Sequence, residues 1–244
     1  MIVRLLAVAV FFGGVLSIQT AAPQEPKSYP DGRGNDINFP LGDLSFADAV
    51  VSFEPGSPLP PPEQDDPAEA LGTPDYGTDQ HNELTLGCGG TAIFRFTDNA
   101  LVDVSGPDLF VFEVGPDVEA TTLSISGDGE IWIDVGRISG ATAAIDIKDF
   151  ITPGETFSFV KLTDARASCG SRFPGADIDA VGAIGAGRRI VLDSAVLFDF
   201  DKFTLKEEAL EILQPLAEEI GQNDIARIVI EGHTDAVGKK GKKS

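Results

Sequence analysis

Hydrophobic and polar residues alternate along most of residues 84–184, which is the pattern of half-buried β-strands. Within residues 91–96, the side chains of Ala92, Phe94 and Phe96 fall on one side of an extended chain. We expect that side to face a hydrophobic core.

A turn signal separates two of these runs. Residues 126–129, Ser-Gly-Asp-Gly, lie between apolar alternating segments, and an Asp-Gly pair in that position predicts a β-hairpin. After the turn, Ile131, Ile133 and Val135 recur at every second position and are expected to face the core together. Residues 109–114 are almost continuously apolar, which predicts a strand buried on both faces.

We find no convincing amphipathic helix between residues 84 and 187, and 27 Gly and 16 Pro supply many turns. The sequence therefore predicts a mainly β protein, with a jelly-roll-like β-sandwich over residues 44–186. The Pro-rich residues 58–67 are expected to form a long loop inside it. Residues 23–43 are polar and rich in Pro and Gly, which predicts a linker.

The pattern changes after residue 187. Residues 190–200 indicate a strand, and residues 204–207, Thr-Leu-Lys-Glu, form a capping box that predicts a helix start. Pro215 interrupts the helix, so we expect a kink or two helical pieces. Residues 225–231 indicate a second strand, which gives a partial α/β unit of strand, helix and strand. The apolar positions at helical spacing are Leu205, Ala209, Leu213, Leu216, Ala217 and Ile220.

Residues 1–22 have the layout of a signal peptide. Arg4 supplies a positive charge, residues 5–16 are apolar, and Ala21 and Ala22 provide small residues for cleavage. The alternative is an uncleaved anchor, although the apolar run is short for a membrane span. We expect an exported protein of the periplasm, associated with the outer membrane.

The net charge and the cysteine content limit the possible partners and the cellular compartment. The formal net charge of −21 makes nucleic acid an unfavourable partner, and the Lys-rich residues 239–243 are interpreted as a solvated tail. Cys88 and Cys169 are the two cysteines, and export to an oxidising compartment predicts a disulfide between them. Two buried free thiols are the alternative.

Two segments carry a family resemblance. Residues 196–202, Val-Leu-Phe-Asp-Phe-Asp-Lys, and residues 229–238, Val-Ile-Glu-Gly-His-Thr-Asp-Ala-Val-Gly, resemble the OmpA C-terminal domain family. The resemblance implies non-covalent binding to peptidoglycan through the diaminopimelate of its stem peptide. It covers about residues 190–238. The family's second helix, with its ligand-clamping arginine, has no counterpart before residue 244, so residues 187–244 are expected to be a truncated OmpA-like domain.

The resemblance points to Asp235 and Thr234 as ligand-binding residues. A carboxylate at Asp235 could pair with an ammonium of diaminopimelate in a charge-assisted hydrogen bond, and the Thr234 hydroxyl could add a contact. The residues alone leave another interpretation open, because a single Asp after a strand is often a turn former or a helix N-cap.

The β-region is similar to bacterial cell-surface sandwich domains of galactose-binding-like shape. The similarity covers about residues 44–185 and rests on residues 106–113, Gly-Pro-Asp-Leu-Phe-Val-Phe-Glu, and residues 175–182, Gly-Ala-Asp-Ile-Asp-Ala-Val-Gly, among others. It implies an extracellular recognition or structural module without a defined ligand. Peptidoglycan is the partner expected for the C-terminal unit, and an envelope protein or a glycan is the partner expected for the sandwich.

Several acids in the β-region could supply oxygen ligands to Ca²⁺, which prefers such donors. The best candidates are Asp177 and Asp179; solvated carboxylates at turns are the alternative. The wider set of candidate ligands is Asp98, Asp103, Asp108, Glu113, Asp177 and Asp179.

The sequence contains few features that are typical of an enzyme. The two histidines, His81 and His233, are too few for a zinc site without other ligands, and neither a Gly-x-Ser-x-Gly motif nor a nucleotide-binding motif occurs. Trp132 could stack on a sugar, but packing on a sheet is favoured. We therefore expect a binding protein without a cofactor, with a bound Ca²⁺ ion as the alternative. It is either a peptidoglycan-bound envelope protein or a secreted recognition β-sandwich whose C-terminal unit is inactive.

Overall fold

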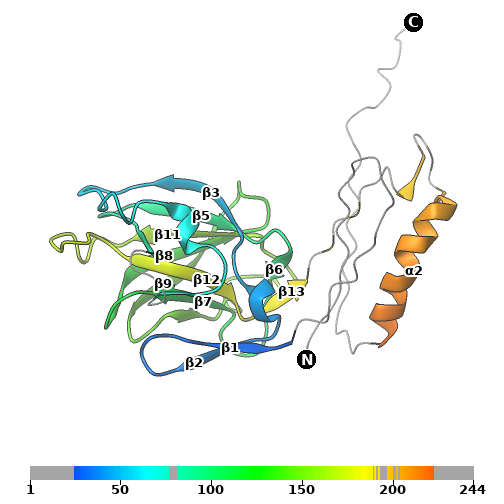
Figure 1. Cartoon of the computed structure of the whole chain (residues 1–244), viewed down its shortest axis with the longest axis horizontal. Helices are drawn as coiled ribbons and strands as arrows, with labels where there is room; N and C mark the ends of the chain where they lie inside the picture. The colour runs from blue at the N-terminus through cyan, green and yellow to red at the C-terminus, as the bar shows by residue number, and fades with distance from the viewer. Residues whose placement is uncertain are drawn as a thin grey trace, which may run out of the picture.

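The computed structural model describes residues 25–76 and 82–188, residues 190, 192, 197–199 and 202, and residues 204–222. This part of the chain is mainly β, with antiparallel sheets and the helix α2 (Glu207–Gln222). Figure 1 shows the strands gathered in one body, with β1 and β2 along its edge. Among the described residues, no helix combines the length and apolar character that crossing a bilayer requires.

Two large sheets dominate this body. The four-stranded sheet has the order β10-β7-β12-β4, and the five-stranded sheet has the order β3-β5-β11-β8-β9. The strands of the four-stranded sheet are β10 (Ala144–Ile145), β7 (Leu109–Glu113), β12 (Asp177–Ala183) and β4 (Leu84–Thr85). Those of the five-stranded sheet are β3 (Ala49–Glu54), β5 (Thr91–Arg95), β11 (Phe159–Asp164), β8 (Val118–Ser126) and β9 (Ile133–Gly140).

The chain crosses repeatedly from one large sheet to the other. Within these two sheets, only β8 and β9 are neighbours both in sequence and in hydrogen bonding. Side chains from both sheets enter one hydrophobic cluster, including Phe94 and Leu162 from the five-stranded sheet and Val111 and Ile178 from the four-stranded sheet. Antiparallel sheets that share a core in this way form a β-sandwich-like arrangement.

Several strand predictions are confirmed. In β5, Ala92 and Phe94 are buried while Ile93 is only partly buried, as the alternation predicts. Every residue of β7 is buried, as expected for a strand covered on both faces. The predicted hairpin is the β8–β9 pair. The Pro-rich residues 58–67 lie mostly in the long connection from β3 to the short helix η2 (Pro67–Ala70).

The prediction for Ile131 is wrong, because its side chain is 73% exposed while Val135 is buried. The strand β9 begins only at Ile133. The physical reason is local. The Oδ1 atom of Asp128 accepts hydrogen bonds from the backbone N–H groups of Glu130 (2.8 Å) and Ile131 (2.9 Å), which keeps this segment in a turn.

The expected linker also differs from the structure. Residues 27–39 form a β-hairpin of β1 (Lys27–Pro30) and β2 (Asp36–Phe39), which leads into the short helix η1 (Gly42–Ser45). Tyr29 and Phe39 are buried in the core cluster, and the Phe39 ring centroid lies 4.7 Å from that of Phe46. Two aromatic anchors in a polar segment are enough to fix the hairpin, because each buries a large apolar area.

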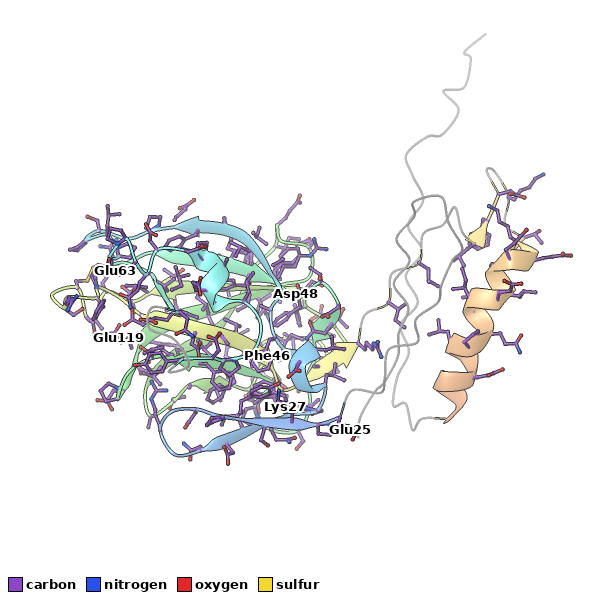
Figure 2. The ribbon with its side chains drawn as sticks, viewed as in Figure 1. Glu25, Lys27, Phe46, Asp48, Glu63 and Glu119 are labelled. Carbon is purple, nitrogen blue, oxygen red and sulfur yellow. A yellow bond between two sulfur atoms is a disulfide. The ribbon has the colours of Figure 1, made fainter. Side chains whose placement is uncertain are left out.

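Gly182 makes this packing possible. A Cβ atom at that position would come within 2.5 Å of Cε1 of Phe39 and 3.0 Å of Cε1 of Phe46. The two rings therefore rest directly on the backbone of β12. Figure 2 shows Phe46 within the β-domain.

Of the strand, helix and strand predicted after residue 187, the described residues include the helix. The helix α2 begins at Glu207 and not after Thr204, because Leu205 forms a β-bridge with Phe198 and the Lys206 N–H donates to the Leu197 carbonyl at 3.0 Å. Pro215 lies inside this single helix. The remaining small strands are β6 (Asn99–Leu101) and β13 (Ala186–Arg188), which pair antiparallel.

The expected disulfide is present. Cys88 and Cys169 are bonded, with their Cα atoms 5.0 Å apart across a sequence separation of 81 residues. The bond joins the loop before β5 to the loop between β11 and β12. It therefore closes a long stretch of chain that includes strands of both large sheets.

We predict that replacing both cysteines, as Cys88→Ala with Cys169→Ala, lowers the free energy of unfolding by about 4–5 kcal/mol, since the loss of a long covalent loop raises the entropy of the unfolded chain. Urea unfolding of the double variant measures the change. Chemical reduction of the unaltered protein should produce a similar loss, and full stability after reduction would contradict the prediction.

We predict that Phe39→Ala lowers the free energy of unfolding by about 3–5 kcal/mol, because a fully buried ring is removed from the core. The control is Asn38→Ala, whose side chain is exposed on the same strand and which should change stability little. Urea unfolding compares the two variants. Equal stabilities would show that the hairpin is not part of the folding unit.

Candidate functional site

Buried acidic side chains gather where β12 begins. This strand pairs with β4 at Asp177↔Thr85 and Ile178↔Leu84, and with β7 on its other side. The register with β7 shifts between Ile178 and Ala180, which makes Asp179 the extra residue of a β-bulge. Bulges redirect side chains, and here the redirected side chain is a carboxylate.

Asp179 is 5% exposed and is held by a loop distant in sequence. Its Oδ1 atom accepts hydrogen bonds from the backbone N–H groups of Asp75 and Tyr76, each at 3.2 Å. The pKa of Asp179 is raised to about 7, mainly by burial; these hydrogen bonds lower it, and the charges of Asp75 and Glu83 add to the rise.

Asp177 lies two residues earlier on the strand. Its Oδ1 atom accepts a hydrogen bond from the Thr85 hydroxyl. Burial raises the pKa of Asp177 to about 7, the Thr85 bond acts in the opposite direction, and the charges of Glu119 and Glu83 add to the rise. Asp177 is thus an acid surrounded by other acids.

Glu83 lies one residue before β4 and is 5% exposed. Its charge contributes to the raised pKa values of Asp177 and Asp179, so it lies near both carboxylates. Its Oε1 atom accepts a hydrogen bond from the Gln64 side-chain amide, while its Oε2 atom is buried and has no hydrogen-bond partner in the described structure. The Oε1 atom of Gln64, which is 3% exposed, likewise has none.

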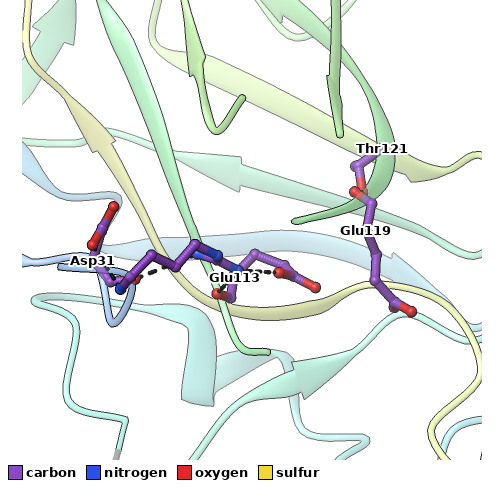
Figure 3. A network of polar contacts seen from close by, with 5 residues as sticks. Asp31, Glu113, Glu119 and Thr121 are labelled. Atoms are coloured by element: carbon purple, nitrogen blue, oxygen red, sulfur yellow. Dashed lines mark hydrogen bonds and ion pairs between the residues drawn. The ribbon is translucent and has the colours of Figure 1, made fainter. Parts of the chain in front are cut away.

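Glu113 is the last residue of β7, the strand that pairs with β12 on the side opposite β4. Its Oε2 atom pairs with Nη2 of Arg33 at 2.7 Å, and the same Nη2 donates to the Glu113 carbonyl at 2.8 Å (Figure 3). Burial raises the pKa of Glu113 to about 8 in spite of Arg33, and the charges of Glu119 and Asp177 contribute to the rise. The tip of the β1–β2 hairpin, where Arg33 lies, is tied to the acids by this pair.

We refer to these acids together as the acidic cluster. Its members are Asp75, Glu83, Glu113, Glu119, Asp177 and Asp179. Burial raises the pKa of Glu119 as well. In Figure 2, Glu119 and Glu63, the neighbour of Gln64, lie toward the same end of the β-domain, away from Glu25 and Lys27. Acids concentrated at one end of a sandwich-like domain can hold protons at neutral pH, because burial and mutual repulsion raise their pKa values.

A second, smaller group of acids lies elsewhere. One oxygen each from Asp103, Asp108 and Asp146 lie within 4.8 Å of one another. Asp108 is buried, and its carboxylate accepts hydrogen bonds from the backbone N–H groups of Val104 (2.7 Å) and Ile147 (2.9 Å). Burial raises the pKa of Asp108 to about 6. Its carboxylate joins two loops, which is a structural task.

The candidates named from sequence divide between these places. Asp177, Asp179 and Glu113 belong to the acidic cluster, whereas Asp103 and Asp108 belong to the smaller group. Asp98 belongs to neither. Burial raises its pKa to about 6, with a further contribution from the charge of Asp48.

Sequence reasoning missed Glu83, Glu119 and Gln64. A polar residue just outside a strand carries no signal of burial, and only the pairing of β4 with β12 brings Glu83 to the site. Thr234 and Asp235 lie outside the described residues.

Trp132 packs on the surface of the five-stranded sheet. Its side chain is partly buried, and the Lys161 ammonium lies 4.4 Å from the ring centroid. A cation over the ring face is a packing interaction in its own right. The favoured interpretation of Trp132 as a sheet-packing residue agrees with this contact.

The chain was compared with known protein families and with solved structures. No family model matches the chain. The C-terminal domain of a chitobiase from Bacteroides fragilis, a crystal structure, is similar at 14% identity with a TM-score of 0.34. The match covers 59% of this chain and 95% of that domain. At this TM-score the similarity supports no inference about fold or function.

We predict that stability decreases as the pH rises from about 5 to 8 when divalent cations are removed. Glu113, Asp177 and Asp179 have pKa values of about 8, 7 and 7 in the folded protein, above those of the unfolded chain. The folded state therefore binds more protons in this range, and its advantage is lost as these groups ionise.

Urea unfolding in a chelating buffer at several pH values tests this dependence. Neutralising a cluster member with Asp177→Asn should flatten the curve, whereas Asp117→Asn, an exposed acid, should leave it unchanged. A stability that is constant or rises over this pH range would contradict the prediction.

Proposed function

We propose that this protein is an exported, non-enzymatic component of the bacterial envelope. In this proposal, residues 1–22 direct export, residues 44–186 form a jelly-roll-like recognition sandwich, and the OmpA-like residues 187–244 bind peptidoglycan without a covalent bond. The periplasm, in association with the outer membrane, is the proposed location. The partner of the sandwich is an envelope protein or a glycan.

The observation that carries the proposal is the Gly-His-Thr-Asp sequence at residues 232–235. It follows a predicted strand, and the helix α2 lies between it and the Phe-Asp-Phe-Asp sequence at residues 198–201, as in the family that it resembles. The Asp235 carboxylate pairs with an ammonium group of diaminopimelate, and the Thr234 hydroxyl supplies a second contact.

Other properties of the chain support this proposal. A formal net charge of −21 disfavours binding to nucleic acid. The Cys88–Cys169 disulfide suits an oxidising compartment outside the cytoplasm.

A second candidate is a secreted recognition protein whose function resides in the sandwich alone. The observation that favours it is the composition of the core. Among the described residues, all buried members of the hydrophobic cluster come from residues 29–183, which include both large sheets. A domain with a complete core of its own can act independently of the neighbouring segment.

We predict that the purified protein is retained on peptidoglycan, and that Asp235→Ala weakens this binding by about tenfold or more, because a charge-assisted hydrogen bond is lost. Co-sedimentation with purified peptidoglycan measures the retained fraction. Free diaminopimelate should compete for binding.

The matched control is Glu211→Ala, which removes the same charge from an exposed position on α2. It should bind as the unaltered protein does. No retention, or equal retention of all three proteins, would contradict peptidoglycan binding at Asp235 and leave the recognition sandwich as the better proposal.

A further inference from the structure

A buried carboxylate lies beside the disulfide. One oxygen of Asp164 and the Sγ atoms of Cys88 and Cys169 all lie within 4.8 Å of one another. Asp164 is the last residue of β11, and its side chain is 3% exposed. Water therefore screens the interaction between this carboxylate and the sulfur atoms only weakly.

The two oxygens of Asp164 have different surroundings. Oδ2 accepts hydrogen bonds from the backbone N–H groups of Gly89 at 2.7 Å and Arg166 at 2.8 Å, which ties together the two loops that the disulfide joins. Oδ1 is buried and has no hydrogen-bond partner in the described part of the chain. Buried polar atoms nearly always have a partner, so a lone carboxylate oxygen near a disulfide requires an explanation.

A second acid lies close to the first. Burial raises the pKa of Glu119, a hydrogen bond from the Ser168 side chain lowers it, and the charge of Asp164 adds to the rise. Ser168 directly precedes Cys169 in the chain. Glu119 therefore adds negative charge on the same side of the disulfide loop.

One cation lies near these acids. The Arg166 guanidinium lies against the backbone at Gly89, where an added Cβ atom would come within 2.5 Å of Nη2. The Arg166 side chain is exposed, so solvent screens its charge much more than that of the buried Asp164. The carboxylates therefore dominate the electrostatic potential at the sulfur atoms.

The two sulfur atoms differ in their access to solvent. Cys88 is 4% exposed, whereas Cys169 is only partly buried. A thiol reductant attacks as its thiolate, and it reaches the Sγ atom of Cys169 more easily. The attack forms a new S–S bond between the reductant and Cys169 and breaks the Cys88–Cys169 bond. The electron pair of the broken bond leaves on the Sγ atom of Cys88, which becomes a buried thiolate.

We propose that Asp164 protects the Cys88–Cys169 disulfide against reduction by thiols, because its carboxylate repels both the attacking thiolate and the departing Cys88 thiolate. This inference goes beyond the proposed function and does not depend on peptidoglycan binding.

The protection follows from the position of the charge. The Cys88 thiolate would form within 4.8 Å of an Asp164 oxygen, in a buried place where like charges repel strongly. The repulsion makes this thiolate a poorer leaving group, and thiol–disulfide exchange becomes slower. The protected bond closes a loop that includes strands of both large sheets, so its persistence matters to the whole β-domain.

The test is the rate at which a thiol reduces the disulfide in the folded full chain. Reduction at about pH 8 is stopped with iodoacetamide, and mass spectrometry measures the fraction of alkylated cysteines. We expect Asp164→Asn to accelerate reduction about tenfold, since it removes a buried charge and keeps an oxygen for the hydrogen bonds from Gly89 and Arg166. Glu119→Gln should accelerate it about twofold to threefold, because Asp164 remains in place.

Two comparisons separate the effect of charge from a loosening of the fold. Asp108→Asn alters another buried carboxylate that accepts two backbone hydrogen bonds, in the group with Asp103 and Asp146. This control should be reduced at the rate of the unaltered protein. The acceleration in Asp164→Asn should also be larger with 3-mercaptopropionate, which carries a carboxylate, than with cysteamine, which carries an ammonium group.

Three outcomes would overturn the proposal. The first is an unchanged rate in Asp164→Asn or, if that variant does not fold, in Glu119→Gln. The second is an equal acceleration in Asp108→Asn, which would indicate a general loosening. The third is slower reduction of Asp164→Asn, which would mean that the carboxyl group promotes reduction by giving a proton to the departing sulfur. None of these measurements involves peptidoglycan, so they leave the proposed function to its own test.

Discussion

The pairing of β12 with β7 on one side and β4 on the other is the interaction that organises the whole β-domain. Ile178, Ala180, Val181 and Ala183 of this strand are buried in the hydrophobic cluster that both large sheets share. At the start of the same strand, Asp177 and Asp179 belong to the acidic cluster. The strand therefore fixes the core and the candidate site in one register, and a slip of one residue would misplace both.

One end of β12 lies against aromatic rings, and the other end lies beside charged side chains. Toward its C-terminal end, Gly182 lets the rings of Phe39 and Phe46 approach the backbone, which brings the β1–β2 hairpin onto the four-stranded sheet. Toward its start, the tip of that hairpin delivers Arg33 to Glu113. The hairpin thus contributes both apolar packing and a positive charge, and a segment with the composition of a linker becomes part of the domain.

Concentrated burial of acids is costly unless something compensates for it, because each carboxylate loses hydration and repels the others. In this protein the core supplies the free energy that holds β12 and β4 together, and the acids lie at the margin of that core. Such a margin is where proteins place binding groups, since the scaffold behind it is rigid. The acidic cluster therefore lies on a rigid scaffold at one end of the sandwich-like domain.

The order of residues alone predicted the strand content of the β-region, the β8–β9 hairpin, the burial of β7 and the Cys88–Cys169 bond. Each depends on the alternation of hydrophobic and polar residues, on turn residues or on the number of cysteines, and these can be read directly from the sequence. The sequence also named Asp177 and Asp179 as candidate ligands, and the structure places both in the acidic cluster. Other features required the folded chain. The exposure of Ile131 depends on hydrogen bonds to Asp128, and the start of α2 depends on a bridge between Leu205 and Phe198. Glu83 and Gln64 enter the acidic cluster through strand pairing and a loop contact between residues distant in sequence. Such long-range contacts depend on which strands pair and which surfaces pack together in the core. A single sequence does not specify this pairing directly.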